Sequence, residues 1–211
     1  MRTVYLVTHP EATHHVENLV GGWYDSELTA RGLRAAGAIA DVLHARIPAG
    51  CAVEVHSSDL RRTRQTAEVV GERLGVEVRL DQGLRELSYG EAEGRPQAWL
   101  AERYLPPPPV GDRMHHDHGV PGAETKWSLV NRVYASVDAI LRSDCEHQVL
   151  VTHGGAATFV VAAWIGMPPE ATGYVNVRVT PGGISELRED DFFHGRQIAS
   201  LDDTGHLVGV L

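Results

Sequence analysis

Apolar residues gather along this chain in short runs that end at polar residues. Such runs lie at 3–7, 53–56 and 148–151, and a further one begins at Val76. They are rich in valine and other large apolar side chains and are too short for separate helices, which is typical of buried strands. The pattern therefore predicts strands that carry polar residues at their carboxyl ends.

Segments with helical spacing of apolar residues alternate with these predicted strands. We expect Thr29 to cap one helix and the polar cluster Ser57-Ser58-Asp59 to cap another. The expected helices span 31–43, 60–74, 124–142 and 156–165. Because strands that alternate with helices require a mainly parallel sheet, we predict an α/β fold, a three-layer sandwich with helices on both faces of the sheet.

The carboxyl-terminal part of the chain has a different pattern. Residues 175–179 and 184–187 flank Pro181-Gly182-Gly183, which is a signal for a hairpin turn. The pattern predicts one antiparallel edge strand on the otherwise parallel sheet. The polar tail from Asp190 is expected to close the chain.

Residues 91–123 interrupt the alternation of strands and helices. They contain the proline run 106–109 and the cluster His115-His116-Asp117-His118, so we interpret them as a partly irregular insertion, or lid, on a single domain spanning 1–211. The histidine cluster matches no structural zinc spacing. A solvated loop is the expected state, and the alternatives are weak metal binding or a contact between one histidine and a substrate.

The net charge and the lengths of the apolar stretches limit the kinds of partner that the protein can bind. Nineteen basic and 28 acidic residues give a formal net charge of −9, which repels nucleic acid and anionic lipid. The two cysteines, Cys51 and Cys145, do not form a disulfide framework or a C-x-x-C motif, and no apolar stretch has the length of a membrane span or a signal peptide. We therefore expect a cytoplasmic protein. The apolar stretch 164–167 could serve a homodimer contact, although burial against the sheet is the simpler expectation.

Histidines and hydroxyl residues follow three of the predicted strands. The segments are Thr8-His9, His56-Ser57-Ser58 and Thr152-His153. The carboxyl ends of parallel strands form the ligand crevice of open α/β sheets. A single histidine there would more often be a hydrogen-bonded structural residue, but two at equivalent strand ends favour a functional site.

Six motifs follow one another along the whole chain. They are His9–Thr29 with Gly22-Trp23, Asp25-Ser26 and Leu28-Thr29; Ser57–Ala67; Leu84–Leu87 with Gly90 and Glu93-Gly94; Pro121–Thr125; Val151–Gly155; and Leu201–Leu207. In type and order they resemble the motifs of the histidine phosphatase superfamily, the phosphoglycerate-mutase-like enzymes. The number of motifs and their fixed order make this resemblance specific.

The resemblance implies roles for four side chains. His9 would attack phosphorus and carry the phosphoryl group, and Arg62 would hold phosphate oxygens with its planar guanidinium. His153 would donate to the same oxygens and stabilise the charge that develops there. Glu86 would protonate the leaving oxygen and then activate water. This scheme requires no metal and no cofactor; without the motifs around them, Arg62 and Glu86 could equally be an ordinary surface pair.

The first motif departs from the family pattern in its phosphate ligands. The replacements are Thr8 for arginine, Pro10 for glycine, Ala12 for threonine and His15 for asparagine. A hydrogen bond to a charged group contributes about 1.5–3 kcal/mol, so the lost arginine weakens the phosphate clamp. We expect Thr8, His15 and Ser58 to bind substrate beside Arg62, and His14 could add positive charge if it were protonated.

The leading interpretation is a phosphomonoester hydrolase that acts on a small phosphorylated metabolite through a phosphohistidine intermediate on His9. A mutase is less favoured, because residues 91–123 are a small insertion for one. One alternative keeps the pocket but uses it for acid–base chemistry on a substrate without a transferable phosphoryl group. The other alternative is a non-catalytic binding module.

Overall fold

The structure is a computed structural model that describes residues 1–210, and one mixed sheet forms its centre. Its strands are β1 (Arg2–Thr8), β2 (Val53–Ser57), β3 (Val78–Leu80), β4 (His147–Thr152), β5 (Ile184–Glu189) and β6 (Arg196–Asp203). They lie in the order β3-β2-β4-β1-β5-β6. The pairs β2–β3, β2–β4 and β1–β4 are parallel, whereas β5 pairs antiparallel with both β1 and β6.

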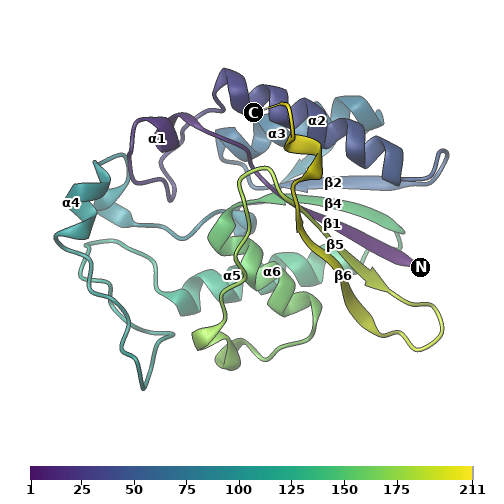
Figure 1. The fold of residues 1–211 in the computed structure, drawn as a ribbon. Coiled ribbons are helices and arrows are strands. Elements are labelled where there is room, and N and C mark those ends of the chain that lie inside the picture. The colour runs from purple at the N-terminus through teal and green to yellow at the C-terminus, as the bar shows by residue number, and fades with distance from the viewer. Residues whose placement is uncertain (211) are drawn as a thin grey trace.

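Helices cover both faces of this sheet, which confirms the predicted α/β sandwich (Figure 1). They are α1 (Thr13–Val16), α2 (Ala30–Arg46), α3 (Arg61–Leu74), α4 (Gln97–Ala101), α5 (Lys126–Leu141) and α6 (Gly154–Trp164). Short 3₁₀ segments lie at Gln82–Leu84, Gly90–Ala92, Pro169–Tyr174 and Gly205–Leu207. Helices α2 and α3 lie on one face, and α5 and α6 lie on the other.

The alternation of side chains along the central strand joins the three layers. In β1, Tyr5 and Val7 belong to the apolar cluster under α2 and α3, whereas Val4 and Leu6 belong to the cluster under α5 and α6. Successive residues of a strand point to opposite faces, so a strand buried on both faces is a continuous apolar run. This is why residues 3–7 were identifiable as a central strand.

The amino terminus of α3 is capped differently from the prediction. Its first residue, Arg61, donates its amide to Asp25 Oδ1 at 2.7 Å, and the N-cap residue Leu60 makes no side-chain bond. The predicted caps do not reach the amides of the helix itself: Ser58 Oγ contacts His153 and accepts from the amide of the N-cap residue Leu60 at 3.4 Å, and Asp59 forms an ion pair with Arg85. The expectation that the 57–59 cluster caps this helix is therefore wrong, because a distant loop supplies the carboxylate.

The hairpin at the antiparallel edge also differs in position. Residues 175–179 lie in no strand, and the hairpin is formed by β5 and β6, so the polar tail supplies the edge strand. The Thr158 hydroxyl of α6 exchanges hydrogen bonds with the Val177 main chain, which holds 175–179 along that helix. The turn at 181–183 leads instead into β5, and Gly182 and Thr8 pair through their main chains.

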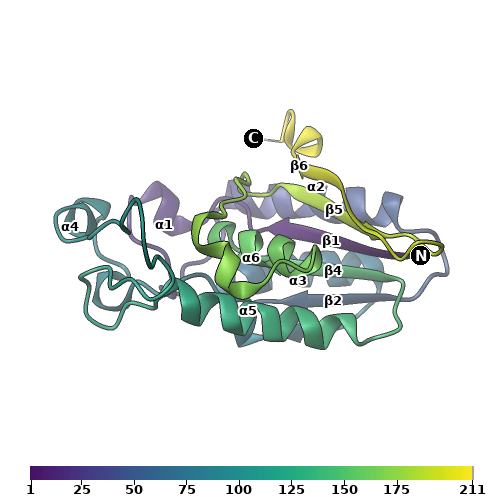
Figure 2. The ribbon, with the colours of Figure 1, turned by 90° about the horizontal axis from the view of Figure 1, so that it is seen from below.

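The insertion lies beyond the carboxyl ends of the parallel strands. Figures 1 and 2 both show α1, α4 and the irregular chain after α4 at the end of the sheet opposite the amino terminus. A small apolar cluster of Val20, Ala92 and Val120 joins this segment to the loop after α1. Its place makes the predicted role as a lid geometrically reasonable.

The apolar stretch 164–167 is only partly buried. Trp164 is buried and its indole donates to the Gln197 carbonyl of β6, whereas Ile165 is exposed; the homodimer contact remains a prediction. Cys51 and Cys145 are free and partly buried. Among residues 1–210, the helices are all too short or too polar to cross a membrane.

Candidate active site

Main-chain pairing places two histidines side by side. Thr8 at the end of β1 lies opposite Thr152 at the end of β4, so His9 and His153 occupy equivalent positions one residue beyond the sheet. The His9 amide donates to the Thr152 carbonyl at 3.1 Å, and the two ring centroids are 5.1 Å apart. Strand register alone therefore brings together two of the predicted catalytic residues.

Local contacts hold the His9 ring in one tautomer. Its Nδ1 lies 2.8 Å from the Pro10 carbonyl oxygen. Because a carbonyl can only accept, Nδ1–H is the donor and Nε2 keeps its lone pair. Burial, followed by the positive charge of Arg62, lowers the pKa of His9 well below its usual value. The imidazole is therefore neutral at pH 7, with Nε2 available as a nucleophile.

Arg62 lies directly against that nucleophilic nitrogen. Its Nε donates to His9 Nε2 at 3.2 Å, and its Nη atoms donate to the carbonyls of Tyr24 and Gly22 at 2.8 and 2.7 Å. The side chain is 1% exposed, and burial lowers its pKa to about 10, so it remains charged at pH 7. A phosphoryl group bound to Nε2 would meet this guanidinium.

His153 and Ser58 form a pair behind the nucleophile. His153 Nε2 lies 2.9 Å from Ser58 Oγ, and Ser58 is fully buried. His153 Nδ1 is buried and makes no hydrogen bond within residues 1–210. Burial, then the charge of Arg62, lowers the pKa of His153 well below its usual value. The predicted contact of Ser58 with substrate stays a prediction, because the present partner of Ser58 is His153.

The replaced positions of the first motif have identifiable contacts. The Thr8 hydroxyl donates to the Thr180 carbonyl at 2.6 Å, so its proton points away from His9. His15 stacks on His9, with ring centroids 5.5 Å apart. Its Nδ1 accepts from the Ala12 amide at 3.2 Å, which leaves Nε2–H as a donor. The Nε2–H of His15 can therefore donate to a phosphate oxygen, whereas the hydroxyl of Thr8 already donates to Thr180.

The suggestion that His14 adds positive charge is wrong. Its Nδ1 lies 2.7 Å from Ser26 Oγ, and burial, followed by the charge of His15, lowers the pKa of His14 to about 3. The ring is therefore neutral at pH 7. The first motif contributes hydrogen-bond donors to the site but no cation.

Glu86 reaches the site from the other side. Its Oε2 accepts from the Gly155 amide and its Oε1 from the Leu87 amide, both at 2.8 Å. A Cβ at residue 155 would lie 2.3 Å from Glu86 Oε1, so only glycine permits this contact. Because Gly155 follows His153 by two residues, the contact joins the predicted acid to the second histidine.

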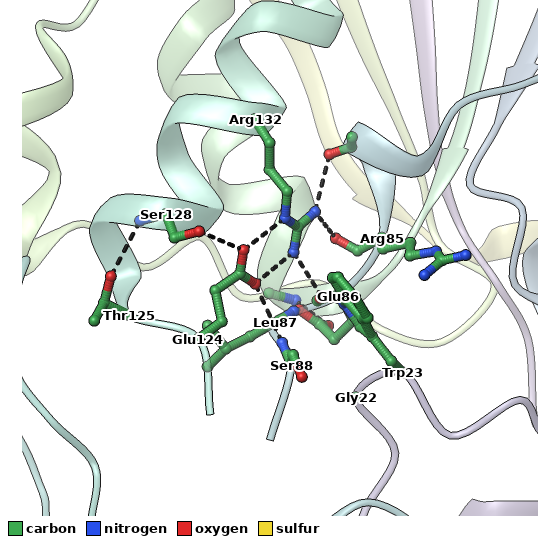
Figure 3. A network of polar contacts seen from close by, with 12 residues as sticks. Gly22, Trp23, Arg85, Glu86, Leu87, Ser88, Glu124, Thr125, Ser128 and Arg132 are labelled. Carbon is green, nitrogen blue, oxygen red and sulfur yellow. Dashed lines mark hydrogen bonds and ion pairs between the residues drawn. The ribbon is translucent and has the colours of Figure 1, made fainter. Parts of the chain in front are cut away.

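A network of polar contacts fixes the loop that carries Glu86 (Figure 3). Arg132 of α5 donates to the carbonyls of Gly83, Arg85 and Glu86 at 2.6–3.0 Å. It also forms an ion pair with Glu124 at 2.7 Å. The Trp23 indole donates to the Glu86 carbonyl at 2.7 Å, and the guanidinium carbons of Arg85 and Arg132 lie 4.8 and 5.8 Å from the centre of its ring. The main chain of residue 86 is therefore held from two elements.

A cavity of about 500 Å³ opens in front of His9, and we refer to it as the first cavity. Glu86 is the one acidic side chain lining it and no lysine or arginine does, while Thr8, His15 and the side chains of Asn18 and Gln97 supply polar groups. Arg62, Ser58 and His153 lie behind this lining and are each at most 1% exposed. Of the four predicted reacting groups, His9 and Glu86 line this hollow, whereas Arg62 and His153 are buried against His9.

The second histidine cluster lies apart from this hollow. His115 contacts Asp112, His116 contacts the Leu105 carbonyl, and His118 stacks on Tyr104. Within residues 1–210, no three histidine, cysteine or acidic side chains are placed to hold one metal ion.

Comparison with known proteins assigns the chain to a family. The model of the histidine phosphatase superfamily (branch 1) matches residues 4–202. The chain belongs to the histidine phosphatase superfamily. A protein from Yersinia enterocolitica named as a probable phosphoglycerate mutase is 30% identical over 98% of this chain and 95% of its own length.

Solved structures show the same superfamily fold. A mycobacterial glucosyl-3-phosphoglycerate phosphatase in complex with VO₃ is 26% identical, with a TM-score of 0.75 and coverage of 97% of this chain and all of that one. The Bacillus stearothermophilus protein YhfR has a TM-score of 0.78 at 23% identity, covering 98% of this chain. The histidine phosphatase relatives are named as phosphatases or mutases, which confirms the predicted enzyme class at the level of the family.

Sequence reasoning missed the supports of the histidine phosphatase site. Trp23 and Glu124 lie within recognised motifs, so the motifs located them without indicating their contacts. Arg132 lies in the middle of an amphipathic helix, where an arginine is most often solvated. Only the tertiary structure shows that it reaches three carbonyl groups of the acid-bearing loop.

Proposed function

We propose that this protein is a phosphomonoester hydrolase that works through a phosphohistidine on His9. The observation that carries the proposal is the state of the His9 ring. Nδ1–H is bound to the Pro10 carbonyl, and Nε2 faces the cation of Arg62 in a cavity that Glu86 also lines. Nucleophile, anion-binding group and acid–base group are therefore within one site.

In the first step, His9 Nε2 attacks phosphorus and the bond from phosphorus to the leaving oxygen breaks. Glu86 enters this step as the carboxylic acid and gives its proton to that oxygen, so the product leaves as an alcohol and Glu86 becomes a carboxylate. Arg62 and the Nε2–H of His15 hold the equatorial oxygens of the phosphoryl group. The Tyr24 and Gly22 carbonyls hold the Nη atoms of Arg62 in place, and as the bond from Nε2 to phosphorus forms, the Nε–H that His9 accepts at rest turns to a phosphoryl oxygen.

In the second step, water attacks the phosphohistidine and Glu86 takes the proton from it. The bond from phosphorus to Nε2 breaks, and inorganic phosphate leaves with the neutral imidazole restored. The two amide contacts of Glu86 hold its carboxylate in one place through both steps. The names of the relatives support a small phosphorylated substrate.

The test is to trap the intermediate. Wild type is mixed with p-nitrophenyl phosphate, quenched within milliseconds, and digested at alkaline pH for mass spectrometry. We expect an acid-labile phosphoryl group on His9, and His9→Ala should lower phosphate release by about a thousandfold or more, as for other removed nucleophiles. His44→Ala, at an exposed position of α2, is the matched control. Unchanged phosphate release in His9→Ala would contradict the proposal.

One observation favours a second candidate, acid–base chemistry on a substrate that keeps its phosphoryl group or has none. Thr8, at the position of the family's arginine, directs its hydroxyl proton to Thr180 and not to the cavity. The trapping experiment separates the two functions, because acid–base chemistry leaves no phosphoryl group on His9. A binding module would show neither trapping nor turnover.

A further inference from the structure

A second cavity of about 500 Å³ lies beside the first, and Glu86 and Tyr89 line both. Arg113, His118, Lys126, Leu129 and Phe159 are among the other side chains that line it. A substrate whose phosphoryl group is at His9 would place its leaving group past Glu86, since the acid must reach the leaving oxygen. The second cavity is the space on the far side of that carboxylate.

Two cations in this cavity have no acidic partner. Lys126 is the only lysine of the chain; its Nζ donates to the carbonyls of Gly173 and Thr172 at 3.0 and 3.5 Å. Arg113 Nε donates to the same Gly173 carbonyl at 3.1 Å, and its Nη1 donates to the Pro108 carbonyl. Within residues 1–210, neither cation forms an ion pair with a carboxylate, and Arg113 Nη2 has no hydrogen bond.

The positive charges of Lys126 and Arg113 also repel one another. Because both donate to one carbonyl oxygen, their charges are held close together, and burial followed by the charge of Arg113 lowers the pKa of Lys126. Most other basic side chains of this acidic protein pair with a carboxylate. Partly buried like charges without a counter-ion are unfavourable until an anion joins them.

The surroundings fit an anion on an apolar stem. Phe159 and Leu129 supply apolar surface in the same cavity, and the Phe159 ring lies 5.6 Å from Lys126 Nζ. His118 Nδ1 is buried there and makes no hydrogen bond within the described chain. The first cavity, by contrast, has no cation in its lining.

We propose that Arg113 and Lys126 bind an anionic group, a carboxylate or a second phosphate, on the leaving-group portion of the substrate. The inference rests on the proposed function for the placement of the phosphoryl group. Binding energy from this remote anion replaces part of what the family's arginine would supply at residue 8. The substrate class is therefore a phosphomonoester with a second negative charge beyond an apolar linker.

Three aryl phosphates test this assignment. They carry a carboxymethyl, a phosphonomethyl or a carbamoylmethyl group opposite the phosphate, and the methylene keeps the phenol leaving groups comparable. We expect kcat/KM to be about tenfold or more higher for one of the two acids than for the neutral amide, the worth of a hydrogen bond to a charged group. The preferred acid identifies carboxylate or phosphate as the anion.

Two variants that each lose one positive charge are compared, one inside the second cavity and one outside it. Lys126→Met should remove most of the preference for the acid over the amide, with Arg113 retaining the remainder, and Lys126→Arg should keep the preference. Arg103→Met, an exposed arginine of the same insertion that pairs with Glu102, removes the same charge outside the cavity and should keep the full preference. Thermal unfolding of each variant confirms that it folds.

A binding measurement separates failure of this inference from failure of the proposed function. The compounds are titrated by calorimetry into His9→Ala, which cannot form a phosphohistidine. Tighter binding of the acid, most of it lost on adding Lys126→Met, supports the anion site even if wild type releases no phosphate. Equal binding of acid and amide overturns the inference, whatever the rate of phosphate release.

Discussion

The first cavity has two walls that are positioned in different ways. The strand-end wall consists of residues 8, 9, 58, 62 and 153, and strand register together with one helix places them. The loop wall consists of residues 82–88, which lie outside the sheet and are held by side chains of α5 and by Trp23. The strand-end wall has lost the family's arginine, whereas the loop wall keeps its motif and a complete network around it.

The two walls also differ in the charges that they carry. The strand-end wall presents one buried arginine and neutral histidines to a phosphoryl group. The loop wall keeps its carboxylate fixed by two amides. Under the proposed function, the group that acts on the leaving oxygen is held in place, whereas the phosphoryl group has one fewer cation to bind it. The contact between Glu86 and Gly155 is the point where the two walls meet.

Breaking that meeting point should have the largest effect. In Gly155→Ala, the new Cβ would lie 2.3 Å from Glu86 Oε1 and displace the carboxylate. A misplacement of about 1 Å costs about a hundredfold in rate, so we expect kcat for p-nitrophenyl phosphate to fall by about that factor. Gly154→Ala, where a Cβ meets nothing within 4 Å, is the control. Equal rates for the two variants would show that the position of Glu86 is unimportant.

Loosening the loop wall alone should have a smaller effect. Arg132→Met removes the donors to the carbonyls of residues 83, 85 and 86, so Glu86 samples more positions and kcat falls by about ten- to thirtyfold. Arg142→Met, at the exposed end of the same helix, should not change kcat. Affinity for vanadate, which reports on the strand-end wall, should be retained in both variants. A loss of vanadate binding in Arg132→Met would show that the walls are not independent.

Repairing the strand-end wall should have a moderate and opposite effect. Thr8→Arg adds a cation at the family position, and one charged hydrogen bond should tighten binding of inorganic phosphate about tenfold. Thr8→Ser keeps the hydroxyl that donates to Thr180 and should bind phosphate as wild type does. Calorimetric titration provides the measurement. Weaker binding to Thr8→Arg would show that this wall is no longer built for a phosphate.

The buried His14, whose ring lies beside that of His9, should make folding sensitive to acid. Burial lowers the pKa of His14 to about 3, whereas in the unfolded chain the ring takes up a proton as pH falls through about 6.5. The free energy of unfolding therefore decreases as pH falls, by about 0.7 kcal/mol between pH 7 and pH 6 for one such histidine. Denaturant titrations of His14→Gln at both pH values should show a pH difference smaller by that amount. Asn131→Gln at an exposed position of α5, which changes no titratable group, should leave the difference as in wild type.

Several parts of this protein could be predicted because a local pattern of residues encodes them. Residues 3–7 form a central strand because a run buried on both faces has no polar position. His9 and His153 were recognisable because each follows such a run, and parallel strands end at one edge. Arg62 and Glu86 were located by the motifs around them.

Tertiary structure decided what depends on pairing between distant segments. The sequence could not indicate which segment pairs with residues 184–189, because residues 175–179 and 196–203 both contain alternating apolar and polar residues. In the structure 196–203 forms the pair, and contacts with Thr158 of α6 hold 175–179 elsewhere. The sequence could not show that Asp25 caps α3, that Thr8 turns to Thr180, or that Arg132 holds the acid-bearing loop. A hydrogen bond between side chain and distant main chain leaves no period in the sequence, so only the folded chain reveals it.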